Sequence, residues 1–193
     1  MSSWHLEESG RGFSFRKDEP LDMRFDPEKE LTAERIINYW SEKELEKIFR
    51  EYGEERFSRR IAKRIFEQRK RGQIKTTFQL IEIIRESFPK KYKFGKTHFA
   101  TRVFQALRIA VNDELENLKE ALPRAIEVLK PEGRIIIISF HSLEDRIVKN
   151  FFRNEAKREK VKILTKKPIK ASREETKKNK RARSAKLRAA EKI

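Results

Sequence analysis

Apolar residues recur every three or four positions from about residue 27 to residue 110, a spacing that predicts a series of amphipathic helices. Phe57, Ile61 and Ile65 show this spacing most regularly, four residues apart. Pro27 suits the first turn of a helix, so we expect the helical region to begin there. The period therefore predicts a largely helical N-terminal half.

Two short patterns predict where helices start within this region. Ser41 is followed three residues later by Glu44, and Thr76 by Gln79, and both pairs match a capping box. Residues 1–26 lack any such period and are expected to be irregular. Trp4, Phe13 and Phe15 lie among its polar residues, and because a dispensable tail rarely carries such aromatics, we expect this segment to dock on something.

The pattern changes after an amphipathic stretch at 113–130. Residues 134–140, RIIIISF, form a continuous β-branched run, which predicts a strand buried on both faces. Residues 141–152 then return to a helical period. Helix, buried strand and helix in this order favour a parallel α/β sheet. Weaker strand patterns at 161–169 and 184–193 would supply its remaining strands.

Charge divides the chain unevenly. The 193 residues contain 48 Lys and Arg against 31 Asp and Glu, a net charge of +17, and residues 149–193 alone carry +13. A basic C-terminal quarter favours a polyanionic partner. A solvated or disordered tail would explain the same charge, and charge alone does not distinguish the two.

Several classes of protein are excluded by composition. The chain has no Cys, which excludes disulfides, zinc–thiolate sites and a Cys nucleophile. No glycine-rich phosphate loop is present, and the three His lack metal-ligand spacing, so we expect no metal site. No apolar run is long enough to cross a bilayer and no signal peptide is visible, so we expect a cytoplasmic protein.

The densest group of polar residues follows the predicted strand at 134–140. Ligands of open α/β sheets bind beyond the carboxyl ends of strands, so this group is a candidate site. A structural explanation is equally concrete: Ser142 with Asp145 matches a capping box, and Glu144 suits the positive end of a helix. The group comprises Ser139, His141, Ser142, Glu144, Asp145 and Arg146.

Two basic segments are candidates for nucleic-acid binding. The helix at 56–71 carries a cationic face, and the loop at 90–98 interleaves Lys with Tyr92 and Phe94, with Phe99 just beyond. Cations bind phosphates and aromatic rings stack on unpaired bases. A solvated face with ordinary core aromatics remains the alternative for any single residue.

Long motifs along the whole chain resemble one family in order. That family is the bacterial ribosomal RNA small subunit methyltransferase H, or MraW, type. The motifs are GRGFSF at 10–15, PLDMRFD at 20–26, FREYGEERFSRRIAKRI at 49–65, FQALRIAVNDEL at 104–115, ISFHSLEDRIVKNFF at 138–152 and RARSAKLRAAEKI at 181–193.

The resemblance implies an α/β fold: the C-terminal part of a class I, Rossmann-like methyltransferase sheet, with an inserted all-α domain. Residues 1–26 would be a substrate-side loop of the cofactor domain, 27–110 the inserted RNA-recognising domain, and 111–193 the rest of the α/β domain. The implied activity is S-adenosylmethionine-dependent methylation of N4 of a cytidine in the decoding region of 16S ribosomal RNA. The implied partner is the small ribosomal subunit.

The family's glycine-rich loop and acidic ribose contact have no counterpart here. The resemblance therefore implies an N-terminally truncated member that binds S-adenosylmethionine negligibly on its own. A non-enzymatic RNA-binding helical module and a basic ribosome-associated structural protein remain alternatives. His5 stands where many members have a Gln that contacts the cofactor.

The resemblance and the strand-end argument together imply the site residues. The expected catalytic contributors are Ser2, Ser3, His141, Ser142 and Asp145, with Ser14 in an adjoining loop. The expected RNA contacts are Arg11, Phe13, Arg59, Arg60, Arg64, Lys96 and Arg146.

Overall fold

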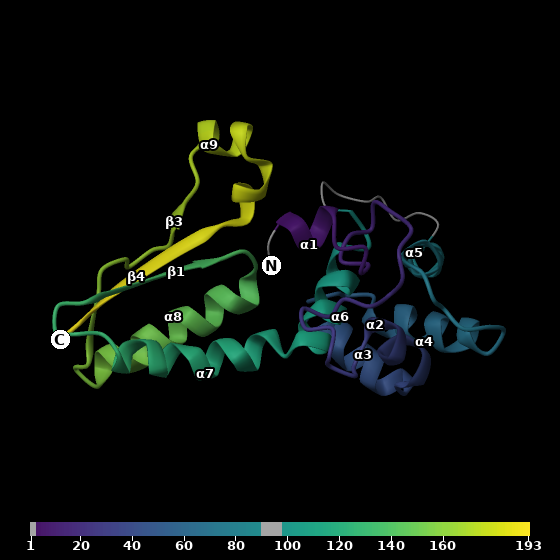
Figure 1. Ribbon diagram of the computed structural model, residues 1–193, viewed down its shortest axis with the longest axis horizontal. Helices are drawn as coiled ribbons and strands as arrows, with labels where there is room; N and C mark the ends of the chain where they lie inside the picture. The colour runs from purple at the N-terminus through teal and green to yellow at the C-terminus, as the bar shows by residue number, and fades with distance from the viewer. Residues whose placement is uncertain (1–2, 90–97) are drawn as a thin grey trace. The chain divides into compact units, whose positions relative to one another are not determined.

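The computed structural model describes residues 3–89 and 98–193 (Figure 1). The chain forms two compact units, the first ending at Glu114 and the second running from Leu115 to Ile193. Among the described residues, the first unit is helical apart from loops, and the second combines helices with a small sheet. The expectation of a mixed α/β protein is confirmed.

The first unit contains six helices within its described residues. Their starts follow local sequence: Ser41 caps α3 and Thr76 caps α5, each in the predicted capping box. The bounds are α1 Ser3–Glu7, α2 Ala33–Tyr39, α3 Glu42–Glu51, α4 Ser58–Arg69, α5 Thr77–Glu86 and α6 Thr101–Asn112.

The core of this unit lies where the apolar period predicted it. Ile61 and Ile65 of α4 are fully buried, and Phe57 just before that helix packs against the same cluster. Phe49 of α3 and Leu107 of α6 are also fully buried. Each helix thus turns one apolar stripe inward, and burial of these large side chains is the main favourable term in folding.

The N-terminal segment is pinned to the start of α5. The Leu21 amide donates to the Lys75 carbonyl over 3.0 Å, and the Thr77 amide donates to the Glu19 carbonyl over 2.9 Å. The expected docking of this segment is confirmed, because Phe13 enters the core with 6% of its surface exposed.

Two expectations about this segment and the residues that follow it are wrong. It is not wholly irregular, since α1 forms near its start. The helical region does not begin at Pro27 either: α2 starts at Ala33, where the Thr32 side chain accepts the Arg35 amide. A side-chain cap outweighs the weaker preference of Pro for a first turn.

The second unit contains three further helices, a 3-10 turn and the sheet. Pro123 does not interrupt α7. The bounds are α7 Glu114–Glu127, β1 Arg134–Ser139, α8 Ser142–Lys157, β2 Val161–Ile163, β3 Ile169–Lys170, α9 Arg173–Lys178, η1 Lys180–Ser184 and β4 Lys186–Lys192.

The predicted parallel sheet is wrong for the described strands, which all pair antiparallel. β4 lies between β1 and β2, and β3 pairs with the first residues of β4. Ile136 lies opposite Ala189, and Ile138 lies opposite Leu187.

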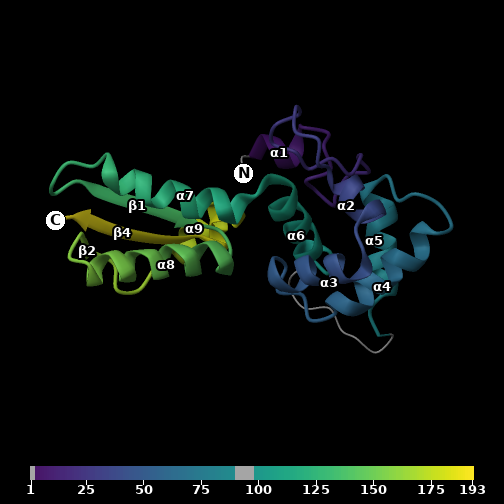
Figure 2. The same ribbon diagram turned by 90° about the horizontal axis from the view of Figure 1, so that it is seen from below.

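Burial of β1 on both faces is also wrong. α7 and α8 lie on the same face of the sheet (Figures 1 and 2), and Ile135 points into the core they form with it. Ile136 and Ile138 alternate with the core residues, and 59% and 53% of their surfaces are exposed. A strand covered on one face exposes every second side chain, whatever its composition.

Candidate functional site

The carboxyl end of β1 leads directly into α8 through His141. The His141 side chain accepts the Glu144 amide, and the Glu144 carboxylate accepts the amides of Phe140 at 2.8 Å and His141 at 3.2 Å. The capping box is therefore His141 with Glu144, one residue earlier than the predicted Ser142–Asp145 pair. The three-residue spacing fits both pairs, so sequence spacing alone does not distinguish them.

Asp145 does not take part in the capping box. It forms a buried ion-pair cluster with β4 instead. Its carboxylate receives the Arg188 Nε at 2.7 Å and the Lys186 Nζ at 3.2 Å. Burial of Asp145 favours its neutral form, but the hydrogen bonds from Arg188 and Lys186 outweigh it and hold the pKa of the carboxyl below its usual range. The cluster fixes the first turn of α8 against β4.

Arg188 and Lys186 were not identified from the sequence. They lie 43 and 41 residues from Asp145, and only the strand pairing brings them together. The available signal was Arg188 itself, a basic residue inside the apolar run LRAA. A buried Arg in a strand requires an acidic partner, because an unpaired buried charge is strongly unfavourable.

The other strand-end residues differ in exposure. Arg146 is exposed and Ser142 is half-buried at the start of α8. Phe140 exposes about half of its surface. An exposed aromatic ring, an accessible cation and a hydroxyl at one strand end can contact a base, a phosphate and an amine, respectively.

His5 lies in an aromatic cluster in the first unit. Its ring centroid is 5.3 Å from that of Trp4, 5.3 Å from that of Phe13 and 5.0 Å from that of Phe25. Burial lowers the pKa of the imidazole, so its neutral form is favoured near neutral pH.

Arg11 and Phe13, both predicted RNA contacts, hold this cluster in place. The Arg11 guanidinium donates to the carbonyls of Arg24 at 3.1 Å and Phe25 at 3.2 Å. Phe13 stacks on Phe25 with a centroid separation of 5.5 Å. The Phe13 ring is buried, whereas stacking on a base requires an exposed ring.

The cationic face of α4 is only partly solvated. Arg59 and Arg60 are exposed. Arg64 forms an ion pair with Glu86 at 2.7 Å, and Arg69 donates to the carbonyls of Ile37 and Trp40. Arg59 and Arg60 are thus the predicted contacts on this helix that present their charge most openly.

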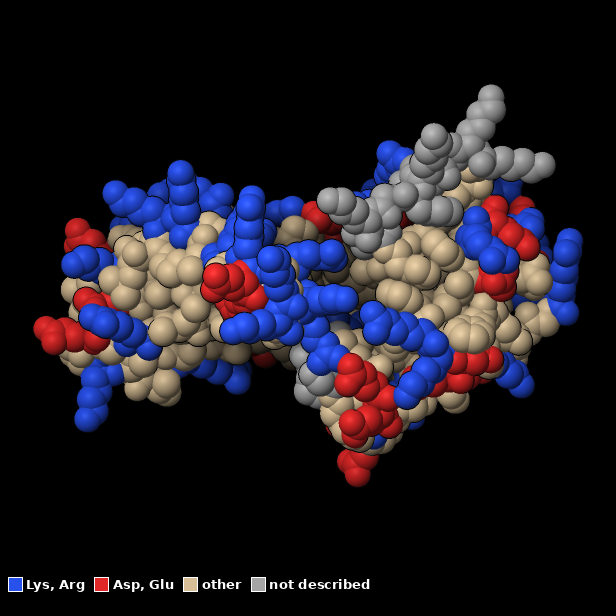
Figure 3. Space-filling view, turned by 90° about the horizontal axis from the view of Figure 1, so that it is seen from above, with Lys and Arg blue, Asp and Glu red and all other residues tan. Residues whose placement is uncertain are grey.

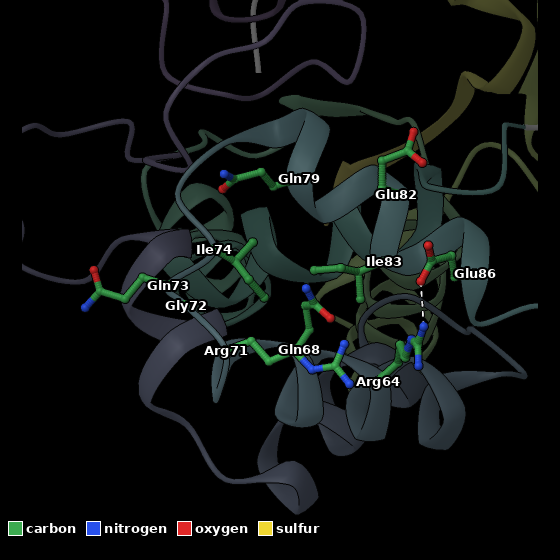
Figure 4. A pocket seen from close by; sticks show the side chains of 10 residues that line it. All are labelled: Arg64, Gln68, Arg71, Gly72, Gln73, Ile74, Gln79, Glu82, Ile83 and Glu86. Atoms are coloured by element: carbon green, nitrogen blue, oxygen red, sulfur yellow. Dashed lines mark hydrogen bonds and ion pairs between the residues drawn. The ribbon is translucent and has the colours of Figure 1, made fainter.

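A polar groove of about 580 Å³ lies between α4 and α5 (Figure 4). Arg64 and Gln68 border it from α4, and Ile83 and Glu86 from α5. The groove was not predictable from the sequence, because its side chains come from segments with unrelated patterns. They include Arg71, Gln73 and Gln79, whose guanidinium and amide groups both form hydrogen bonds readily.

Several predicted residues lie outside the described part of the chain or have undescribed side chains. Ser2 and Lys96 lie outside the described residues, as do Tyr92 and Phe94 of the predicted basic loop, and the side chain of Ser3 is likewise undescribed.

Over the part of the chain that is described, no helix has the length and apolar character that a membrane span requires.

The fold and these surfaces define a class: a two-unit protein with a helical unit that carries exposed Arg residues and an α/β unit with a polar strand-end site. Comparison with known families narrows this further. Residues 1–193 match the MraW methylase family, and the chain belongs to that family.

Curated proteins align with this chain over its whole length. It is 57% identical over 193 residues to a ribosomal RNA small subunit methyltransferase H of Synechocystis sp. and 56% identical to that of Nostoc punctiforme. The protein of that name from Brevibacillus brevis is 51% identical over 208 residues. The chain spans 61%, 63% and 66% of the lengths of these three relatives, respectively.

Proposed function

We propose that this chain is the RNA-recognising and base-orienting part of an S-adenosylmethionine-dependent methyltransferase. Its target would be N4 of a cytidine in the decoding region of 16S ribosomal RNA. The observation that carries this proposal is the 57% identity, over the full chain, to a ribosomal RNA small subunit methyltransferase H. The motifs from GRGFSF to RARSAKLR support the choice of cytidine N4.

The second unit would be the C-terminal part of a class I methyltransferase sheet. Its strand order, with antiparallel β4 between β1 and β2, supports this placement. Residues 27–110 would form the inserted RNA-recognising domain, with residues 1–26 as the substrate-side loop and 111–193 as the remainder of the α/β domain.

The chemistry requires no covalent catalyst. The exocyclic amine of cytosine is itself the nucleophile, which agrees with a chain that lacks Cys. Its lone pair is conjugated with the ring, so the site must hold the base out of its stack, orient the nitrogen and accept a proton.

We assign these tasks to the strand-end residues. His141 and Ser142 would contact the base, and Arg146 would contact a neighbouring phosphate. Ser2 and Ser3 remain proposed contributors from the N-terminal segment. Asp145 would act as a positioning residue, because Arg188 and Lys186 already engage its carboxylate.

The residues present do not fit a complete S-adenosylmethionine site. The sequence offers no glycine-rich loop, and the His5 ring is packed among three aromatic rings. His5 could supply one contact at most, and we assign no step of the methyl donor's chemistry to this chain.

A chimera tests the proposal. This chain replaces the matched stretch of the Synechocystis relative, and the chimera is expressed in a bacterium that lacks the modification. Nucleosides from its 16S ribosomal RNA are then analysed by mass spectrometry. We expect N4-methylcytidine to appear. The double variant Arg59→Gln, Arg60→Gln should reduce it about tenfold, since each cation contributes to phosphate binding.

The matched control is Lys43→Gln with Lys47→Gln, which removes two exposed cations from α3 in the same unit. This control should retain most of the modification. A folded chimera that binds RNA but leaves every cytidine N4 unmodified would refute the enzymatic proposal and favour the RNA-binding module.

A further inference from the structure

A basic arm leaves the sheet of the second unit between β2 and β4. We define it as residues 165–186, which include β3, α9 and η1 (Figure 1). It contains ten Lys and Arg against two Glu, so its net charge is +8, close to half of the chain's +17. Figure 3 shows Lys and Arg side chains gathered over this part of the unit.

Most of this charge is available to a partner. Nine of the ten cations are exposed, and Lys186 is half-buried against Asp145. Eight form no ion pair with any residue that the structure describes: Lys166, Lys167, Lys170, Arg173, Lys177, Lys178, Lys180 and Arg183. Like charges held together without counter-charges favour an anionic partner.

The arm is an ordered segment with its own local hydrogen bonds rather than a solvated tail. At its base, Thr165 Oγ1 accepts the Ala189 amide at 2.9 Å. Ser172 caps α9 by accepting the Glu175 amide at 3.0 Å, and the Asn179 side chain accepts the Arg181 amide at 3.1 Å. Cations on an ordered scaffold lose less conformational entropy on binding than cations on a disordered tail.

The arm is also anchored where it returns to the sheet. β3 pairs with β4 through Ile169 opposite Leu187 and Lys170 opposite Lys186. The next inward residue, Arg188, is locked to Asp145 of α8. The buried cluster at the strand end therefore fixes the place from which the arm projects.

The composition of the arm indicates what it binds. Residues 165–186 contain no Phe, Tyr, Trp or His, so they offer no surface on which a base could stack. Seven of the ten cations are Lys, which binds phosphate as a point charge. Both features favour the phosphate backbone over base edges.

From these observations we propose that the basic arm binds the phosphate backbone of the RNA substrate independently of base sequence. This inference rests on the proposed function, because it takes RNA as the polyanion. It adds a further RNA-binding surface to the two already proposed, which are the exposed cations of α4 in the first unit and the strand-end residues of the second.

The test compares two charge-matched triple variants of the full chain. The arm variant is Lys177→Gln, Lys178→Gln, Lys180→Gln. The control is Lys149→Gln, Arg153→Gln, Lys157→Gln, which removes three exposed cations from α8 in the same unit. Binding is measured by fluorescence anisotropy across a KCl series, with two labelled RNA hairpins of equal length and unrelated sequence.

We expect the arm variant to lose about tenfold or more in affinity for both hairpins. The slope of log affinity against log salt should fall by about 2, since each lost phosphate contact contributes about 0.7–0.9. The control should lose far less. A second arm variant, Lys166→Gln, Lys167→Gln, Lys170→Gln, should repeat the loss without altering α9, which guards against a local folding defect.

Equal losses in the arm and control variants would overturn the inference, as would a loss confined to one hairpin. Stronger binding to a polyglutamate peptide than to RNA would overturn it in favour of an acidic protein partner. If the unaltered chain bound neither hairpin, the proposed function itself would fail. If the chain bound both and the arm variants bound equally well, only the arm proposal would fail.

Discussion

At the scale of single residues, Gly12 of the GRGFSF motif occupies a backbone position that suits only glycine. It adopts a φ of +71°, and a Cβ built there would lie 2.3 Å from the Pro20 carbonyl oxygen. Its amide donates to Glu19 at 2.9 Å. Gly10 has a similar φ of +65° but open space around it. Substitution at Gly10 would therefore introduce backbone strain alone, whereas substitution at Gly12 would add a steric clash to that strain.

We predict that Gly12→Ala destabilises the first unit by roughly 2–4 kcal/mol, and Gly10→Ala by only about 1–2 kcal/mol. Both Trp residues lie in the first unit, so urea unfolding followed by Trp fluorescence measures this difference directly. Equal destabilisation by the two substitutions would show that the Pro20 contact is unimportant.

Asp145 carries the second prediction at this scale. Asp145→Asn leaves Arg188 buried without a charged partner, which should destabilise the second unit by about 3–5 kcal/mol at neutral pH. Circular dichroism of urea unfolding measures the loss. The control Asp113→Asn alters an exposed carboxylate and should change stability little.

The pH dependence of this effect has a definite sign. The folded protein holds the Asp145 pKa below its ordinary value of 3.8. Its contribution to stability is therefore fully present above pH 3.8 and is lost as pH falls through the lower, folded value. The stability gap between the native chain and Asp145→Asn should narrow only in that acid range. A gap that closed near neutral pH would contradict the assignment.

At the scale of elements, β1 combines an apolar face with an open edge. Among the described strands it pairs only with β4, and Ile136 and Ile138 are exposed on the face opposite α7 and α8. Exposed apolar strands with unpaired edges tend to associate.

We predict that the chain self-associates at micromolar concentrations through β1, and that Ile138→Lys suppresses this association. Light scattering as a function of concentration measures it. The control Val128→Lys places the same charge at an exposed apolar position outside the sheet. If both substitutions improved solubility equally, general charge rather than the β1 face would be responsible.

The elements also show what the sequence could predict. Capping boxes at Ser41 and Thr76 act within one turn, so local sequence determined these helix starts. The strand at 134–139 was predictable from its β-branched run, but its exposure depends on which elements cover each face. The direction of strand pairing and the Asp145–Arg188 ion pair could not be predicted from local sequence, because both depend on residues more than 40 positions apart.

At the scale of the whole molecule, candidate RNA-binding cations occur in both units. Arg59 and Arg60 lie on the first unit, whereas Arg146 and the basic arm belong to the second. Under the function proposed above, these surfaces together would recognise the decoding region of 16S ribosomal RNA.

The most direct test is crosslinking of the full chain to small ribosomal subunits that lack the modification, followed by sequencing of the crosslinked nucleotides. We predict crosslinks concentrated around the decoding region of 16S ribosomal RNA, weakened by the arm variant and by Arg59→Gln with Arg60→Gln. Crosslinks scattered evenly over the ribosomal RNA would contradict it.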